Sequence, residues 1–201
     1  MAILPRIEYL LLSLTLGMGS ATVLATPVIY TIDPDHTHPL FETDHYNGLS
    51  VWRGVFKKTR GTVTLDREAR TGAVDIEVDM TSVEFGHDKL NAMAVSSVAP
   101  PILEAVKYPV AHYAGTLTHF KRGIPTAVVG DLTMHGVTKP VTLRIDSFKC
   151  VANLPQQTKE VCGADASARF NRADFGITVG QKYGFKMDVN LRIQIEATRA
   201  E

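Results

Sequence analysis

Apolar and polar residues alternate strictly over two stretches of the chain. From Val74 to Met80 and from Phe185 to Glu196, apolar residues take every second position, and charged or amide residues take the positions between them. This period of two is typical of β-strands with one buried and one solvated face. Two such long strands are difficult to place in a helical fold, so the pattern indicates a β-protein.

Shorter extended segments, separated by turns that contain Gly or Pro, fill much of the remaining sequence. So many antiparallel strands in one chain predict a sandwich or a closed barrel. Closure removes exposed sheet edges, so we favour an all-β, extended antiparallel barrel of about eight strands. The expected segments are residues 28–33, 39–43, 51–57, 62–65, 110–120, 127–134, 137–149 and 164–170.

The spacing of apolar residues changes within residues 88–106. Leu90, Met93 and Ala94 lie at helical spacing, two adjacent prolines follow, and residues 102–106 form a second short apolar group. Prolines interrupt helices, so this arrangement predicts two short helices inserted between strands.

Large apolar residues recur on the predicted strand and helix faces. An eight-stranded barrel can be filled by such side chains or leave room for one small ligand, and alternation alone does not distinguish the two. If the barrel is open, we expect an elongated apolar tunnel that the inserted helices close near one end. Its predicted wall residues are Phe41, Phe56, Met93, Ile102, Leu103, Phe175, Phe185 and Met187.

Residues 1–25 have the features of an export signal. Arg6 lies near the start, an apolar stretch runs from Tyr9 to Met18, and small residues lead to Ala25. The stretch is shorter than the roughly 20 apolar residues that span a membrane. We therefore expect cleavage after Ala25 and a single mature domain of residues 26–201. An uncleaved N-terminal anchor is the alternative.

The charge balance narrows the range of partners. The chain has 21 basic and 21 acidic residues and a formal net charge of zero, with no basic run. This neutrality argues against nucleic acid or an anionic membrane surface as the partner. We also expect no stable membrane insertion.

Cys150 and Cys162 are the two cysteines of the chain. In an exported protein a close pair most economically forms one disulfide, because the compartment is oxidising. The alternative is a thiol site for metal or redox chemistry, but there is no CxxC spacing to support it.

Catalytic and metal-binding motifs are scarce. The sequence contains no GxSxG, HExxH, phosphate-binding loop or dinucleotide-binding glycine pattern, so we expect no enzyme, although dispersed catalytic residues remain an alternative. His36 and His38 form an HxH pair near His45, which can begin a metal site. The other histidines lie in different predicted elements, so we expect neither a metal nor a cofactor.

Arg172 allows two interpretations. It can be a cation at the mouth of the tunnel that binds an anionic head group, since a guanidinium binds phosphate in a bidentate manner. It can also fasten a turn by binding a carboxylate or backbone carbonyls. We favour the structural role, because Asp174 lies two residues away and would neutralise the charge.

Several sequence phrases together resemble the YceI-like family of periplasmic isoprenoid-binding proteins. The densest are Gly130–Val141 (GDLTMHGVTKPV) and Asn171–Ile177 (NRADFGI), preceded by Tyr30–His36 (YTIDPDH) and Tyr108-Pro109. The resemblance runs from Tyr30 to Ala197.

The resemblance implies an extended lipocalin-like antiparallel barrel in the periplasm. Some members of this family hold a polyisoprenoid or isoprenoid-quinone tail in the lumen. In one respect this chain departs from the family: Asp88-Lys89-Leu90 is present, but the paired aromatic residues that commonly follow are absent. From this departure we expect a changed ligand preference.

The leading functional hypothesis is a non-catalytic periplasmic binding or carrier protein for a long-chain isoprenoid of the polyprenyl or quinone type. One alternative is an envelope stress protein with a filled barrel that acts through protein contacts. The other is an enzyme that acts on a hydrophobic substrate.

Overall fold

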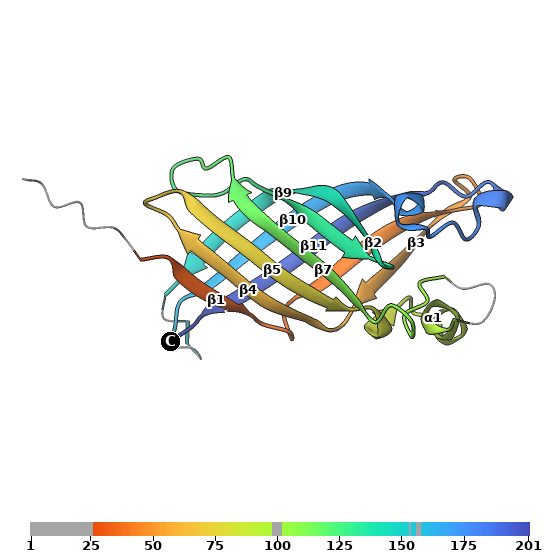
Figure 1. Ribbon diagram of the computed structural model, residues 1–201. Coiled ribbons are helices and arrows are strands. Elements are labelled where there is room, and N and C mark those ends of the chain that lie inside the picture. Colours follow the sequence, from red (N-terminus) through yellow and green to blue (C-terminus); the bar gives the residue numbers. More distant parts are fainter. Residues whose placement is uncertain (1–25, 98–101, 153, 156–157) are drawn as a thin grey trace, which may run out of the picture.

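A computed structural model describes residues 26–97, 102–152, 154–155 and 158–201, and Figure 1 shows their arrangement. Eleven strands in this part of the chain form one sheet in which every pairing is antiparallel. The strands are β1 (Val28–Ile32), β2 (His38–His45), β3 (Ser50–Phe56), β4 (Thr59–Asp66), β5 (Thr71–Asp79), β6 (Val83–Glu84), β7 (Val110–Thr118), β8 (Ala127–Met134), β9 (Val137–Val151), β10 (Val161–Asn171) and β11 (Asp188–Arg199).

The sheet closes because β1 pairs with both β4 and β11, which gives a ring of eight strands in the order β1-β4-β5-β7-β8-β9-β10-β11. β1 and β2 lie end to end along the same edge of β11: Ile32 is opposite Ala197, and His38 is opposite Gln194. β2 and β3 thereby lengthen the barrel beyond the closed ring. The predicted eight-stranded antiparallel barrel is confirmed.

Strand β11 shows how the sequence pattern produces the wall. Its exposed residues between Val189 and Ile195 alternate with buried or half-buried ones, as the period-two pattern predicts. The strand begins at Asp188 rather than at Phe185, so the first three residues of the predicted strand are outside it. The residues that face the interior are Val189, Leu191, Ile193, Ile195 and Ala197.

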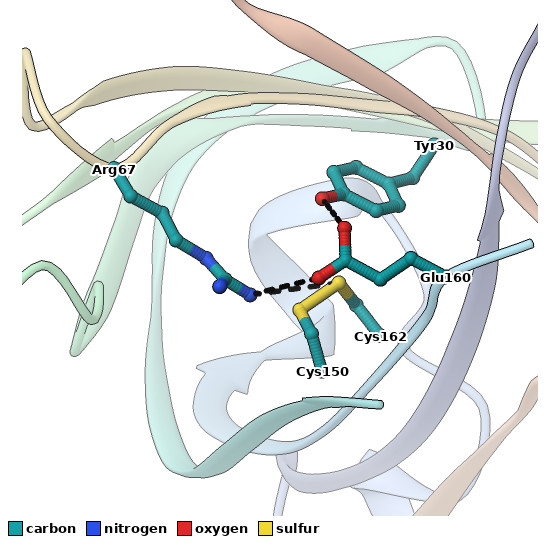
Figure 2. The surroundings of a disulfide bond; sticks show 5 residues. All are labelled: Tyr30, Arg67, Cys150, Glu160 and Cys162. Atoms are coloured by element: carbon teal, nitrogen blue, oxygen red, sulfur yellow. Dashed lines mark hydrogen bonds and ion pairs between the residues drawn. A yellow bond between two sulfur atoms is a disulfide. The ribbon is translucent and has the colours of Figure 1, made fainter. Parts of the chain in front are cut away.

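The end of the barrel near the C-terminus is filled by side chains around a disulfide. Cys150 on β9 lies opposite Cys162 on β10, and the two are bonded, which confirms the predicted pairing. Figure 2 shows Glu160 beside the disulfide: it accepts a 2.9 Å hydrogen bond from the Tyr30 hydroxyl and lies 3.7 Å from the Arg67 guanidinium. Cys150, Glu160 and Cys162 are near enough together to suggest a metal site, but disulfide sulfurs are not the thiolates that bind metals.

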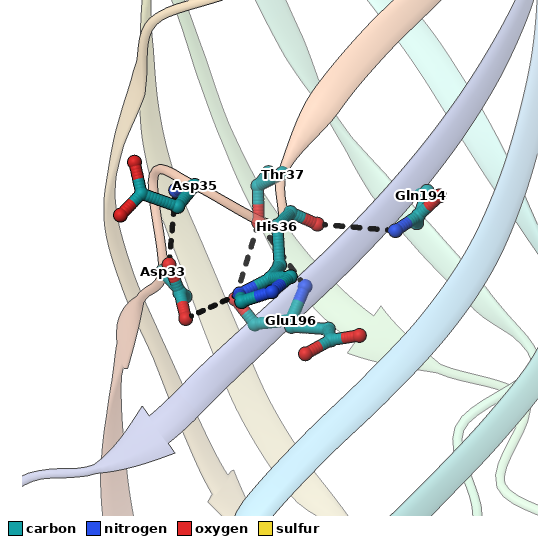
Figure 3. Close-up of polar contacts among 6 residues, drawn as sticks. All are labelled: Asp33, Asp35, His36, Thr37, Gln194 and Glu196. Atoms are coloured by element: carbon teal, nitrogen blue, oxygen red, sulfur yellow. Dashed lines mark hydrogen bonds and ion pairs between the residues drawn. The ribbon is translucent and has the colours of Figure 1, made fainter.

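The chain bends at residues 33–37, between β1 and β2, and Figure 3 shows this bend. Because of the bend, both strands pair with the same edge of β11. Thr37 is fully buried. Its hydroxyl donates to the backbone carbonyl of Glu196 at 3.2 Å and accepts from the N–H of Glu196 at 3.1 Å. Asp33 accepts from the N–H of Asp35 at 2.9 Å, and its other carboxylate oxygen lies 2.9 Å from His36 Nδ1. These contacts replace the strand hydrogen bonds that the bend interrupts.

The pair of His36 and Asp33 predicts a measurable titration shift. The hydrogen bond to Asp33, and then its charge, raise the pKa of His36 above 6.5, while the bond to His36 lowers the pKa of Asp33 below 3.8. The pair's contribution to stability is fully present between pH 3.8 and 6.5. It is lost as the pH falls through the pKa of folded Asp33 or rises through that of folded His36.

We expect Asp33→Asn to return the His36 pKa toward its ordinary value, as measured by NMR titration. Because His36 is exposed, the accompanying change in stability should be small. Asp35→Asn is the matched control, since the charge of Asp35 is the last and smallest of the causes that raise the pKa of His36, and a much smaller change is expected. An unchanged His36 titration in Asp33→Asn contradicts the assignment.

The helical insertion contains one helix rather than the two predicted. Helix α1 (Asp88–Val95) begins where His87 Nδ1 accepts the N–H of Leu90 at 3.2 Å. The expected second helix is wrong: residues 102–109 form bends and turns, and Glu104 has a positive φ of 47°. A right-handed helix cannot continue through that conformation.

The backbone of residues 102–106 bonds to the end of α1 instead. The N–H of Leu103 donates to the carbonyl of Ala94, and the N–H of Val106 donates to that of Val95, both at 3.1 Å. These bonds supply partners to the last carbonyls of the helix. The segment therefore packs as a cover beside α1.

Candidate functional site

A cavity of about 1070 Å³ occupies the half of the barrel away from the disulfide. Along β11 its wall runs from Val189 to Ile195, and six steps at about 3.3 Å per residue correspond to roughly 20 Å. It continues past the strand ends to Tyr46 and Tyr183. The barrel is thus filled at one end and hollow at the other. Further wall residues are Ile76, Tyr113, Leu143, Phe170 and Leu191.

The wall of the hollow half is completed by the helical insertion. β6 pairs with β3 at only two positions and ends the strand order of the described residues, so the sheet stops at this edge. α1 and residues 102–106 cover this place, with Ala94 fully buried and with Ile102 and Leu103 facing the cavity. The insertion thus forms part of the cavity wall near its mouth.

Five of the eight predicted wall residues line the cavity and three do not. Phe175 is 1% exposed, and its ring packs edge-on against Phe170 at 5.4 Å, within the core. Met187 is also buried in the core, and its carbonyl accepts the N–H of Arg172 at 2.8 Å. Met93 is half-buried on α1 without reaching the cavity. The residues that line it are Phe41, Phe56, Ile102, Leu103 and Phe185.

Aromatic rings gather where the cavity reaches the surface. The ring of Phe185 lies 4.7 Å from that of Tyr46 and 5.1 Å from that of His45. The ring of Trp52 is 5.4 Å from that of His45 and 6.5 Å from that of Phe85. Tyr46, Trp52 and Phe85 were not among the predicted wall residues. The alternation in β3 places Trp52 on the same side as Gly54 and Phe56, but it does not show that free space lies beside Trp52.

The Arg172 guanidinium fastens a turn, as the structural interpretation predicted. Arg172 is 8% exposed; its Nη1 donates to the carbonyl of Ile177 at 3.0 Å, and its Nη2 to that of Val179 at 2.7 Å. Its hydrogen bonds therefore go to carbonyls rather than to Asp174, which was the expected neutralising partner. Burial lowers the pKa of Arg172, and the charge of Asp44 opposes this shift.

Arg172→Met is expected to lower the free energy of unfolding by roughly 2 kcal/mol, because it leaves two carbonyls without their donors. Urea unfolding measures this change. Arg169→Met is the control: the Arg169 side chain is 67% exposed and pairs with Asp188 at 3.0 Å on the surface, so its removal should have little effect. Equal stability of Arg172→Met and the wild type contradicts the fastening role.

Two other polar groups of the wall are bound within the protein. His135 Nε2 lies 2.7 Å from Glu104 Oε2, and His135 Nδ1 lies 3.0 Å from the carbonyl of Phe175. The Tyr113 hydroxyl donates to the carbonyl of Val141 at 2.8 Å, and burial raises the pKa of Tyr113 to about 12. Both ring nitrogens of His135 are occupied, and the Tyr113 hydroxyl stays neutral.

The HxH pair lies outside this cavity. His36 is in the bend of Figure 3, with its ring 57% exposed and bound to Asp33, and His38 begins β2. No helix in the described ranges is long and apolar enough to cross a membrane.

The model of the YceI-like domain family matches residues 30–197. The chain belongs to the YceI-like family. The family match covers all the barrel strands except the ends of β1 and β11. It also includes the helical insertion and the Arg172 turn.

One relative and two proteins of known structure are similar to this chain. A UPF0312 protein of Vibrio parahaemolyticus is 30% identical over 90% of this chain and 95% of its own length. BcnA of Burkholderia cenocepacia has a TM-score of 0.63 and 18% identity, covering 83% of this chain and 99% of its own. A polyisoprenoid-binding domain from Saccharophagus degradans, implicated in plant cell wall breakdown, has a TM-score of 0.59 and 14% identity, covering 85% and 98%.

Proposed function

We propose that this YceI-like protein binds a long-chain isoprenoid lipid, of the polyprenyl or isoprenoid-quinone type, and carries it through the periplasm. The elongated apolar cavity of about 1070 Å³ is the observation that carries the proposal. Its volume is at the upper limit of ordinary small-molecule pockets, which hold about 300–1,000 Å³. The similar fold of the polyisoprenoid-binding domain from Saccharophagus degradans supports it.

The physical basis is the removal of an insoluble tail from water. Burial contributes roughly 25 cal/mol for each Å² of apolar surface removed from solvent. The deep wall is formed by residues such as Leu143, Ile193 and Ile195. Their apolar side chains can cover a lipid tail that lies along the cavity. The charges of Arg172 and Glu104 are already bound within the protein and do not compete for an apolar ligand.

A binding role agrees better with the cavity than catalysis does. A general base needs a ring nitrogen or carboxylate free to take a proton, but both His135 nitrogens have protein partners. His45, which also lines the cavity, lies at the mouth among the rings of Trp52 and Phe185. The Tyr113 hydroxyl, with its pKa of about 12, stays protonated at neutral pH. The alternative of a barrel filled along its whole length does not agree with a cavity of this volume.

Export to the periplasm is part of the proposal. The disulfide of Cys150 and Cys162 suits an oxidising compartment. The predicted signal segment, residues 1–25, lies outside the described residues. Mass spectrometry of the protein from the cell envelope should show a chain that begins at Thr26.

Native mass spectrometry of protein purified from the producing cells, without detergent, tests the function. We expect a second species heavier than the polypeptide by the mass of one isoprenoid, which organic extraction then identifies. A protein that never carries lipid contradicts the carrier role. Chemical conversion of the bound lipid during incubation would favour an enzyme instead.

A further inference from the structure

We propose that the mouth of the cavity docks on an anionic phospholipid bilayer. The docking surface, called here the tip, consists of residues 45–53 and 180–186. They comprise the turn from β2 into β3 and the loop that contains the 3₁₀ turn η3 (Gln181–Tyr183). Figure 1 shows these segments extending together beyond the barrel, at the end away from the C-terminus. The inference rests on the proposed function, since it concerns how the ligand enters and leaves.

Exposed apolar side chains gather on the tip. Leu49 is 76% exposed, Tyr183 60%, Tyr46 53% and Val51 52%. These are four of the ten large hydrophobic residues that are exposed in the described part of the chain. Single exposed residues need no explanation, whereas a gathered group marks a contact surface.

The two segments of the tip form one surface. The ring of Tyr46 lies 4.7 Å from that of Phe185, and the N–H of Lys186 donates to Asp44 at the base of the turn at 2.9 Å. Gly180 is required here: it has a φ of +85°, and a Cβ at this position would lie 2.5 Å from the Phe185 ring. The turn from β2 into β3 and the η3 loop are therefore held against each other.

The charge of the tip differs from that of the whole chain. The neutrality of the whole chain, from which we expected no anionic membrane partner, does not extend to the tip, whose two segments contain Arg53, Lys182 and Lys186 and no acidic residue. Arg53 is paired with Glu42 on β2 at 2.8 Å, and Asp44, just outside the tip, lies against Lys186, so Lys182 carries the unbalanced positive charge. Basic residues near a bilayer surface are attracted to anionic head groups, and long basic side chains extend around apolar ones.

The residue types at the tip match the boundary between head groups and acyl chains. Trp and Tyr are enriched at this boundary because their rings have an apolar body and a polar edge. Tyr46, Trp52, Tyr183 and Phe185 also line the cavity, so the docked tip would face the opening toward the lipid. An isoprenoid could then pass between membrane and cavity without crossing water.

Flotation with two kinds of vesicle tests the docking. We expect binding to vesicles of phosphatidylethanolamine with phosphatidylglycerol, and weaker binding to pure phosphatidylcholine. Leu49→Ser/Tyr183→Ser should weaken binding to the anionic vesicles by about tenfold or more, because it removes apolar area from the boundary. Lys182→Gln/Lys186→Gln should weaken binding to the anionic vesicles and leave binding to phosphatidylcholine unchanged.

Ile124→Ser/Val129→Ser is the matched control. Both residues are exposed, at 41% and 49%, and lie away from the tip on the β7–β8 loop and on β8. This variant should bind as the wild type does. Trp52 is the single tryptophan of the chain, so brominated phospholipids should quench its fluorescence in wild-type protein from which lipid has been extracted.

Three results overturn the docking proposal. One is no vesicle binding by the wild type, and another is equal loss of binding in the control variant. The third is self-association in sedimentation that depends on Leu49 and Tyr183 and occurs without vesicle binding, which would make the tip a contact between two copies of this chain.

Copurified isoprenoid, measured on the same preparations, separates this inference from the carrier role. If the protein copurifies with isoprenoid but does not bind vesicles, the docking proposal is contradicted and the carrier role is not. Vesicle binding by a protein without isoprenoid supports docking and contradicts the carrier function.

Discussion

A carboxylate placed in the cavity wall is expected to abolish lipid retention. Ile193 is in the middle of β11, with its side chain toward the cavity. In Ile193→Asp the charged group would face the apolar tail, and an unpaired charge in such surroundings carries a large desolvation cost. We expect the copurified lipid, measured by native mass spectrometry, to fall below detection.

The variant must be shown to fold, by circular dichroism and by thermal unfolding. Asn190→Asp on the same strand is the matched control, because Asn190 is exposed and the new charge would remain in water. Ala111→Phe provides an uncharged second test, since Ala111 lines the cavity and a phenyl ring would fill part of it. Wild-type amounts of lipid in folded Ile193→Asp and Ala111→Phe contradict binding in this cavity.

Removal of the disulfide is expected to have the largest effect on stability. Cys150 and Cys162 are 12 residues apart. Closure of a loop of this length stabilises by about 3 kcal/mol in the chain-entropy model. Cys150→Ala/Cys162→Ala should therefore lower the melting temperature by roughly 6–12 °C, at about 2–4 °C per kcal/mol for a domain of this size.

Lipid retention should survive in that double variant, because the disulfide lies in the filled end of the barrel, away from the cavity. Wild-type protein under a strong reductant should melt near the temperature of the variant. Equal melting of oxidised wild type and variant would show that the cross-link does not stabilise the barrel.

The strands were predictable because their pattern is local, whereas the closure is not local. The alternation from Val189 to Ile195 depends only on neighbouring positions. Closure depends on β11 pairing with β1 at one end and β2 at the other, across more than half of the chain. The buried hydroxyl of Thr37, which joins the bend to Glu196, has no signature in the sequence.

The second helix could not be excluded from sequence for a similar reason. The apolar spacing of residues 102–106 suits a helix, but the chain turns at Glu104 and bonds to the carbonyls of Ala94 and Val95. Those partners become available only because α1 ends beside the segment. Tertiary contacts thus override the local preference.

The candidate site was predictable as a set of inward apolar residues, but its extent was not. Phe175 and Phe185 are both large and apolar, yet the first packs against Phe170 in the core and the second lies at the mouth. Whether free volume remains depends on how opposite walls meet. The partners of Arg172 were likewise hidden, since backbone carbonyls carry no sequence signal.

Electron density from crystals of protein purified without detergent tests the central claim most directly. We predict one continuous elongated feature that begins at the mouth beside Tyr183 and ends near Ile195, with the polar end of the lipid toward the mouth. A cavity that contains only ordered water, or one that side chains have filled, would contradict the account.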